Sequence, residues 1–153
     1  MVQWQVKQFS ELSPEELYQL LRLRSEVFVV EQNCPYLDAD NADQQALHLL
    51  GHSPEGLAAY TRLFAPGTRY PMASIGRVVT APFARGKGLG RLLMERSIAE
   101  AAERWGDVPV KISAQQHLQK FYASLGFIQT SEMYLEDNIP HIEMVIHNIH
   151  LKQ

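Results

Sequence analysis

Arg85-Gly86-Lys87-Gly88-Leu89-Gly90-Arg91 is the most informative segment of this chain. Before it, the apolar run 74–80 predicts a strand, which Ala81-Pro82 ends. After it, apolar residues recur at helical spacing from Met94 to Trp105, and Gly106 is expected to close that helix. A strand that enters a glycine-rich turn and then a helix is typical of phosphate binding. The first turn of a helix has free N–H groups and a positive dipole end.

The composition of this turn also favours an anion. Gly86, Gly88 and Gly90 have no Cβ, so a phosphate can approach the backbone closely. Three cationic side chains flank the same turn: Arg85, Lys87 and Arg91. The segment is not a Walker A loop, because Gly88 follows Lys87 where that loop needs Ser or Thr. It also departs from the dinucleotide pattern Gly-x-Gly-x-x-Gly, because position 91 is Arg and several strands precede it.

Two motifs together resemble a known family. The spacing Arg85-x-x-Gly88-x-Gly90 resembles the pyrophosphate-binding signature of the GNAT acetyltransferases. Phe121-Tyr122-Ala123-Ser124-Leu125-Gly126-Phe127 resembles that family's closing helix, Tyr-x-x-x-Gly-Phe, and follows in the family's order and at its usual separation. Three further segments resemble the ElaA subgroup, whose acceptor is not assigned: 28–36, 75–78 and 139–142.

The resemblance implies one domain over residues 1–153, with the splayed, mixed α/β sheet of the GNAT fold and acetyl-CoA as co-substrate. It implies that Tyr122 lies near the CoA sulfur and acts as a general acid. A phenol, with an ordinary pKa of about 10, suits the protonation of a departing thiolate. The structural alternative for Tyr122 is a packed aromatic side chain.

The resemblance also places the cofactor contacts by position. Val78, Val79 and Thr80 would offer backbone groups to the pantetheine arm, and one of their N–H groups, at a bulge, would polarise the thioester carbonyl. The pyrophosphate would lie on the turn made of Arg85, Gly86, Lys87, Gly88, Leu89, Gly90 and Arg91. Gln115 stands where many members have Asn, and this longer amide can still reach the cofactor.

The rest of the chain completes a β-α-β-β-β-α-β-α-β-β order, which predicts a mixed α/β sheet with helices on its faces. Ser13-Pro14-Glu15-Glu16 has the form of a capping box at the start of the first helix. The expected strands are 2–6, 46–51, 57–64, 74–80, 108–114, 127–135 and 141–149, and the expected helices are 14–28, the one ending at Trp105, and 116–125.

An alkylammonium must lose a proton before it attacks a thioester, and two residues are candidates for the base. Glu31 follows the first helix on the expected acceptor side, where it would also attract a cationic amine. The alternative for Glu31 is a solvated glutamate at a helix end. His141 brings an imidazole, the side chain that serves most often as a general base, or else a structural hydrogen-bonding group at a strand start.

Other polar residues are interpreted as structural. Asp38, Asp40 and Asp43 lie in a segment expected to be a solvated loop, which would alternatively steer a cationic acceptor. A calcium loop is not favoured, because the required Gly is absent and position 49 is Leu. Cys34 is expected to be a small buried or half-buried residue rather than a nucleophile.

The overall composition narrows the class of protein. A formal net charge of −3 does not favour a nucleic acid or an anionic membrane as partner. The single cysteine excludes an intramolecular disulfide, and we find neither a membrane-spanning apolar run nor a signal peptide, so a cytoplasmic protein is expected. The histidines show no metal-ligand spacing, and no metal site is predicted.

We therefore expect direct transfer of an acetyl group from acetyl-CoA to a primary amine in a ternary complex. One alternative is a non-catalytic acyl-CoA-binding or sensing module on the same fold, because fold alone does not establish activity. Another is a nucleotide-binding protein that uses the same glycine turn. The acceptor, a small molecule or a peptide amine, stays open, as does the choice between a monomer and a homodimer.

Overall fold

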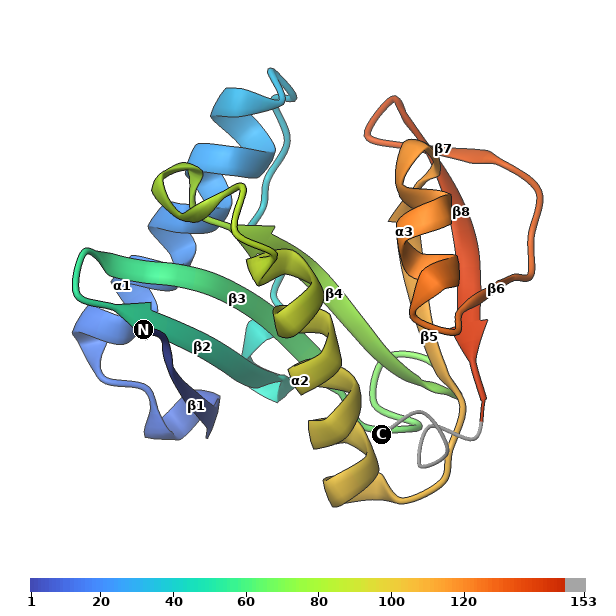
Figure 1. Ribbon diagram of the computed structural model, residues 1–153, viewed down its shortest axis with the longest axis horizontal. Coiled ribbons are helices and arrows are strands. Elements are labelled where there is room, and N and C mark those ends of the chain that lie inside the picture. The colour runs from blue at the N-terminus through green and yellow to red at the C-terminus, as the bar shows by residue number, and fades with distance from the viewer. Residues whose placement is uncertain (148–153) are drawn as a thin grey trace.

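The computed structural model describes residues 1–147, which form one mixed β-sheet with helices on both faces (Figure 1). The strands are β1 (Gln3–Gln8), β2 (Leu47–Ser53), β3 (Gly56–Phe64), β4 (Ala73–Thr80), β5 (Val110–Gln115), β6 (Ile128–Gln129), β7 (Tyr134–Glu136) and β8 (Ile139–Ile146). The helices are α1 (Pro14–Arg24), α2 (Leu89–Trp105) and α3 (Gln119–Ser124). The sheet order is β1-β2-β3-β4-β5-β8-β6, with β7 also paired to β8. The predicted α/β architecture is confirmed.

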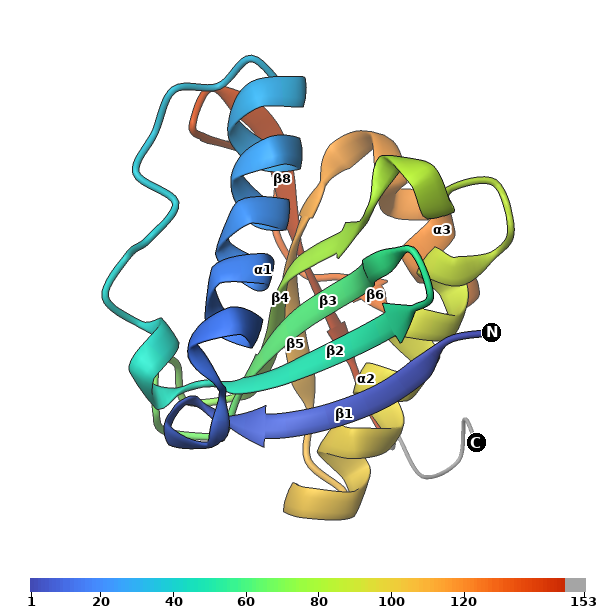
Figure 2. The same ribbon diagram turned by 90° about the vertical axis from the view of Figure 1, so that its left-hand side faces the viewer.

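Apolar side chains attach the helices to opposite faces of the sheet. Leu93, Met94 and Ile98 of α2 are buried in the larger core cluster. Leu20 and Leu23 of α1 belong to a second cluster on the other face. Figure 2 shows α1 and α2 on either side of the strands between them. Within residues 1–147, no helix has both the length and the apolar character that a membrane span requires.

The first helix begins as predicted and ends differently. The Ser13 hydroxyl accepts a hydrogen bond from the Glu16 N–H (3.1 Å), and the Glu16 carboxylate accepts one from the Ser13 N–H (2.8 Å), so the capping box is confirmed. The α-helix stops at Arg24 rather than at residue 28, and wider π-helical turns continue over Ser25–Glu31. β-Branched side chains in this stretch crowd a regular α-helix. The helical path therefore continues as far as Glu31.

The strand predicted over 127–135 is divided into two short strands. β6 pairs with β8 at Val145 and Met144, whereas β7 pairs with β8 at residues 139–141. Between them the Ser131 hydroxyl accepts the Glu143 N–H (2.9 Å), so a side chain replaces a backbone partner and the ladder is interrupted. The last strand ends at Ile146, and the part of its prediction that covers 148 and 149 lies outside the described residues.

The sheet opens between β4 and β5, the only parallel pair of strands among residues 1–147. These strands pair at just two positions, Ala73 with Val110 and Ser74 with Lys111, and then diverge, as the V shape in Figure 1 shows. A register shift in the β3–β4 pairing adds a bulge, where Arg77 adopts a left-handed backbone conformation (φ 51°). The divergence therefore leaves backbone groups of both strands without a neighbouring strand.

Candidate functional site

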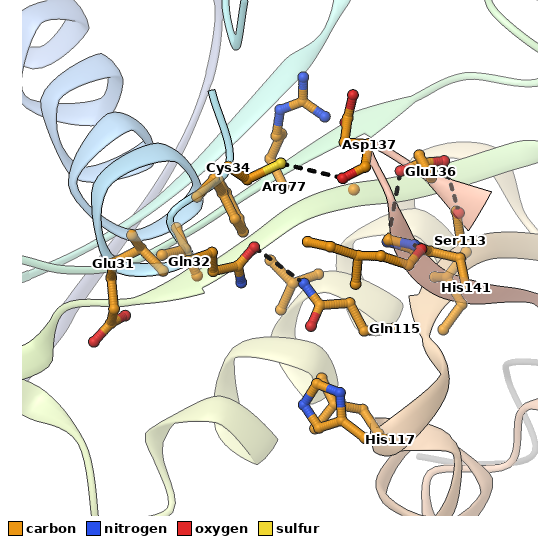
Figure 3. A pocket seen from close by; sticks show the side chains of 18 of the residues that line it. Glu31, Gln32, Cys34, Arg77, Ser113, Gln115, His117, Glu136, Asp137 and His141 are labelled. Atoms are coloured by element: carbon orange, nitrogen blue, oxygen red, sulfur yellow. Dashed lines mark hydrogen bonds and ion pairs between the residues drawn. The ribbon is translucent and has the colours of Figure 1, made fainter. Parts of the chain in front are cut away.

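A cavity of about 500 Å³ occupies the opening between β4 and β5 (Figure 3). Its wall on one side is the end of the π-helical segment, and on the other side it is β5 together with the β7–β8 turn. Twelve of the lining residues carry the argument below: Glu31, Gln32, Cys34, Arg77, Val78, Val79, Thr80, Arg85, Ser113, Gln115, Tyr122 and His141. Most of the residues proposed from the sequence thus meet in one place.

The edges of the diverging strands can bind an extended ligand through its polar groups. No residue of β4 after Ser74 pairs with β5, although β4 continues to Thr80. Val78, Val79 and Thr80 line the cavity at this unpaired edge. Backbone N–H and C=O groups that lack a strand partner need another hydrogen-bonding group, and an amide-containing chain lying in the cleft would supply one.

The glycine turn lies at one end of this cleft and leads into α2. Gly88 precedes α2 with a left-handed φ of 74°, and no side chain caps the helix. A Cβ at Gly86, Gly88 or Gly90 would meet no atom within 4 Å, so the space beside the turn is open. The uncapped N–H groups of this 17-residue helix therefore face a site where an anion fits.

Tyr122 of α3 combines burial with access to the cleft. Its side chain is 6% exposed and packs edge-on against Phe121 and Phe127. Among residues 1–147 no group hydrogen-bonds to its hydroxyl, yet that oxygen is not a buried unsatisfied atom, so it reaches the cavity. Burial raises the pKa of Tyr122 to about 12, and the phenol consequently stays protonated at neutral pH.

A row of polar side chains crosses the sheet beside the cleft. His141 of β8 is directly opposite Tyr134 of β7 on one side and Gln115 of β5 on the other, so the three side chains lie on the same face. The Gln115 Nε2 donates to the Gln32 Oε1 (3.4 Å), which bridges the cleft to the end of the π-helical segment. Gln115 therefore lies at the cleft, while its predicted contact with the cofactor stays a prediction.

Residues 10–148 of the chain match the acetyltransferase (GNAT) domain family. The chain belongs to the GNAT acetyltransferases. The protein ElaA of Escherichia coli is 45% identical over 146 residues, which cover 94% of this chain and 95% of that one. A Pseudomonas aeruginosa acyl-CoA N-acyltransferase structure is 47% identical, with a TM-score of 0.92 over 95% of this chain and 99% of that one. The crystal structure of Escherichia coli ElaA is 44% identical, with a TM-score of 0.90 over 96% and 100% of the two chains. The resemblance to GNAT proteins of the ElaA type is confirmed.

Within this GNAT fold, Glu31 lies beside the glycine turn that leads into α2. Its two carboxylate oxygens each accept a hydrogen bond from the Arg85 guanidinium at 2.6 Å. These hydrogen bonds lower the pKa of Glu31 and raise the pKa of Arg85. A carboxylate with a lowered pKa is a weaker proton acceptor. The proposed role of Glu31 as the base stays a prediction, and its partner in the structure is an arginine of the glycine turn.

The acidic segment predicted to be a solvated loop is instead part of a buried ionic network, so that prediction is wrong. Asp38 and Asp43 are each only 6% exposed. The fully buried Arg24 of α1 donates to Asp38 (2.8 Å) and to Asp43 (2.7 Å). Arg62 of β3 donates to Asp40 (2.8 Å) and to the same Oδ1 of Asp43 that accepts from Arg24 (2.8 Å). Although burial opposes ionisation, the hydrogen bonds from arginine hold the pKa of Asp40 and of Asp43 well below the usual range.

The network also reaches the bulge of β4. The Arg77 Nε lies 2.9 Å from the Asp38 carboxylate, at an angle too bent for a hydrogen bond, and its Nη2 donates to the Asp38 carbonyl (3.1 Å). The left-handed residue of the bulge is therefore anchored to the acidic segment. The sequence did not reveal this contact, because the partners are 39 residues apart and belong to different elements.

Three polar residues of the site were missed from the sequence: Ser113, Tyr134 and Glu136. The Ser113 hydroxyl donates to the Glu136 carboxylate (3.1 Å) and shares a hydrogen bond with the Tyr134 hydroxyl. No local motif marks these residues, since only the pairing of β5, β7 and β8 brings them together.

Cys34 is buried, as expected, and its thiol donates to the Asp137 carbonyl (3.2 Å).

Proposed function

We propose that this protein is an acetyl-CoA-dependent N-acetyltransferase that transfers the acetyl group directly to a primary amine in a ternary complex. The observation that carries the proposal is one continuous feature. The cleft between the diverging strands β4 and β5 leads into the uncapped glycine turn of α2. Membership of the GNAT family and the similarity to an acyl-CoA N-acyltransferase support this assignment.

The residues present fit the two ends of an acyl-CoA molecule. The free edge at Val78, Val79 and Thr80 suits the amide groups of a pantetheine arm. The turn from Arg85 to Arg91 suits the pyrophosphate, because its glycines leave open space and its helix end has unpaired N–H groups. Gln115 can supply one further side-chain amide at the cleft.

The acetyl thioester supplies an activated carbonyl and a thiol leaving group. The protein contributes orientation, because both reactants are held in one cleft. An N–H group at the β4 bulge is placed to donate to the carbonyl oxygen as negative charge develops there. The Tyr122 hydroxyl gives its proton to the departing sulfur, and the proton still carried by the new amide nitrogen restores the phenol. One further proton of the ammonium must leave before attack.

Thermal unfolding of the purified chain with acetyl-CoA, CoA, ATP or NAD in separate samples tests the cofactor assignment. A ligand at about 100 times its dissociation constant stabilises the folded state by roughly 2.7 kcal/mol, which at this chain length is a shift of several degrees. We expect a shift with the two CoA species alone. A larger shift with ATP or NAD would instead support a nucleotide-binding protein.

A thiol-release assay with a panel of primary amines then tests the transfer itself. We expect CoA to appear in amounts that match the acetylated amine. Stabilisation by acetyl-CoA without transfer to any amine of the panel would favour a non-catalytic acyl-CoA-binding module over the proposed enzyme.

A further inference from the structure

The orientation of His141 fixes which ring nitrogen is available to a substrate. Its Nδ1 lies 2.7 Å from the Ile139 carbonyl oxygen. A carbonyl only accepts, so Nδ1 carries the proton of the neutral ring, and Nε2 has the free lone pair. The residue is 7% exposed and lines the cleft. The backbone therefore holds His141 in the tautomer that can accept a proton at Nε2.

The neighbour of this lone pair is a second acceptor. The Glu136 Oε2 lies 3.6 Å from the His141 Nε2, while the Oε1 of the same carboxylate is held by the Ser113 hydroxyl at 3.1 Å. Tyr134 stacks on the His141 ring and hydrogen-bonds to Ser113, which fixes the geometry further. Two acceptors thus face each other with no donor of residues 1–147 between them. An ammonium group carries several N–H donors and can serve both at once.

The charges around this position favour a cation. Among residues 1–147, the arginines and lysines that line this cavity or the cavity next to it all have a carboxylate partner: Arg62, Arg69, Arg77, Arg85 and Lys111. The carboxylates of Glu136 and Asp137 have no arginine or lysine within 4.0 Å in the same part of the chain. The end of the cleft at the β7–β8 turn therefore carries uncompensated negative charge.

This end of the cleft is separate from the glycine turn. Figure 3 places Glu31 on the far side of the cleft from His141 and Glu136. A second cavity of about 630 Å³ shares Ser113 and Glu136 with the first cavity, and Tyr36, Tyr70 and Tyr134 contribute aromatic rings to it. An amine can therefore approach through the second cavity, with its ammonium group leading, while the co-substrate enters from the glycine turn.

We propose that the acceptor is a cationic primary amine whose ammonium group binds between Glu136 and His141, and that His141 takes the proton which must leave before attack. This inference rests on the proposed N-acetyltransferase function. One N–H bond of the ammonium breaks, the proton bonds to the Nε2 of His141, and the electron pair stays on the amine nitrogen. The imidazolium later releases this proton to water. Glu136 is a positioning residue, which attracts the ammonium and stabilises the imidazolium.

The other titratable groups near the ring are few. Tyr134 stacks on it from β7, Cys34 and Asp137 meet at the adjoining turn, and His117 lines the same cavity below β5. Glu143, the next residue on this face of β8, is paired with Lys111 at 3.0 Å. Glu136 is thus the charged group nearest to the Nε2 of His141.

The test measures acetyl transfer to spermidine, phenethylamine and L-lysine as a function of pH, for the unmodified chain and four variants, one of them a control. His141→Gln should reduce kcat about 10²- to 10⁴-fold and remove the ascending limb of the pH–rate profile. Glu136→Gln should raise the KM for the amine, because the ammonium group loses its carboxylate partner. Glu136→Asp should restore part of this effect. Thermal stabilisation by acetyl-CoA should stay unchanged throughout.

Glu132→Gln is the matched control, since it removes the same charge from an exposed position just before β7 that lines neither cavity. It should leave the rate and the pH profile unchanged. If the wild type acetylates an amine and both His141→Gln and Glu136→Gln keep its rate and profile, the inference is overturned while the proposed function stands. If acetyl-CoA binds and no amine is acetylated, both the inference and the proposed function fail. Should His141→Gln not fold, the Glu136→Gln variant, changed at a partly exposed side chain, tests the inference by itself.

Discussion

Single side chains at this site differ in how far their environment has changed their acid–base chemistry. Tyr122 is nearly buried, and its hydroxyl has no protein partner among residues 1–147. Glu31 is exposed at the surface and held by an arginine. Burial therefore raises the pKa of a proton donor, whereas an ion pair lowers the pKa of a carboxylate that was proposed as an acceptor.

Replacing Tyr122 by Phe should lower kcat about 10²-fold or more, with little change in acetyl-CoA affinity. Among residues 1–147 the hydroxyl has no hydrogen-bond partner that the variant would lose, so stability should change little. Because the pKa of Tyr122 is raised to about 12, the wild type should not lose activity through this group until the pH approaches that value. Steady-state rates and thermal shifts measure both effects. Equal turnover in Tyr122→Phe would contradict the acid role and leave the fold assignment intact.

Replacing Glu31 by Gln should strengthen CoA binding a few-fold, because Arg85 is released from its carboxylate and becomes free for the pyrophosphate. The effect should diminish at high salt, where the exposed pair is already screened. Calorimetric titration with CoA at low and high ionic strength measures it. With His141 as proton acceptor, kcat should be preserved. A large loss of kcat with unchanged CoA affinity would return Glu31 to the role of base.

At the level of elements, two local departures from regular structure shape the site. The bulge of β4 is anchored to the acidic segment through Arg77, and the same segment is attached to α1 and β3 through Arg24 and Arg62. The glycine turn before α2 is left-handed at Gly88 and has no cap. The ionic contacts of the bulge fix the position of β4 beside the cleft. The glycine turn leaves the end of the cleft open.

Replacing Arg24 by Met should destabilise the fold by about 3–5 kcal/mol, since it leaves buried carboxylates without their cation. Arg22→Met is the control, because Arg22 is exposed and pairs only with Glu26 within the helix. Denaturant unfolding compares the two variants. In the wild type the lowered pKa values of Asp40 and Asp43 stabilise the fold at pH values above about 3.9, the unfolded carboxyl value. That stability should be lost as the pH falls further. Similar losses in both arginine variants would argue against a structural network.

The variants Gly88→Ala and Gly67→Ala form a matched pair that tests the glycine turn before α2, because Gly67 lies outside that turn. Both glycines have a left-handed φ, and a Cβ at either position would meet no atom within 4 Å. Each substitution should therefore cost about 1–2 kcal/mol of unfolding free energy. Gly88→Ala alone should weaken CoA binding, because its Cβ would occupy the space beside the uncapped helix end. Equal CoA affinity in the two variants would place the pyrophosphate elsewhere.

At the level of the whole molecule, local patterns predicted the element order, the glycine turn before α2 and the helix that carries Tyr122. The glycine turn and Tyr122 are legible because each depends on residues adjacent in sequence. The ionic network was missed because Arg24 lies on a helical face that otherwise reads as apolar, and its partners are 14 and 19 residues away. The pairing of Glu136 with His141 was missed because it depends on three strands coming together.

From the opening of the sheet we predict a change in amide hydrogen exchange when CoA binds. Beyond two paired positions, β4 and β5 have no common ladder. Saturating CoA should therefore slow amide exchange in residues 75–80 and 112–115 together. The amides of β1 and β2, which are already paired along their length, should not change. Protection confined to one of the two strands would show that the ligand does not lie between them.

The gap between β4 and β5 has a consequence for turnover in the proposed enzyme. A ligand in this gap acts as a removable strand, and the chemical reaction does not alter the part of the molecule that fills it. Free CoA keeps the same pantetheine and pyrophosphate as acetyl-CoA, so the product should be retained nearly as well as the co-substrate. The enzyme is then subject to product inhibition, and its output follows the ratio of acetylated to free CoA rather than the concentration of acetyl-CoA alone.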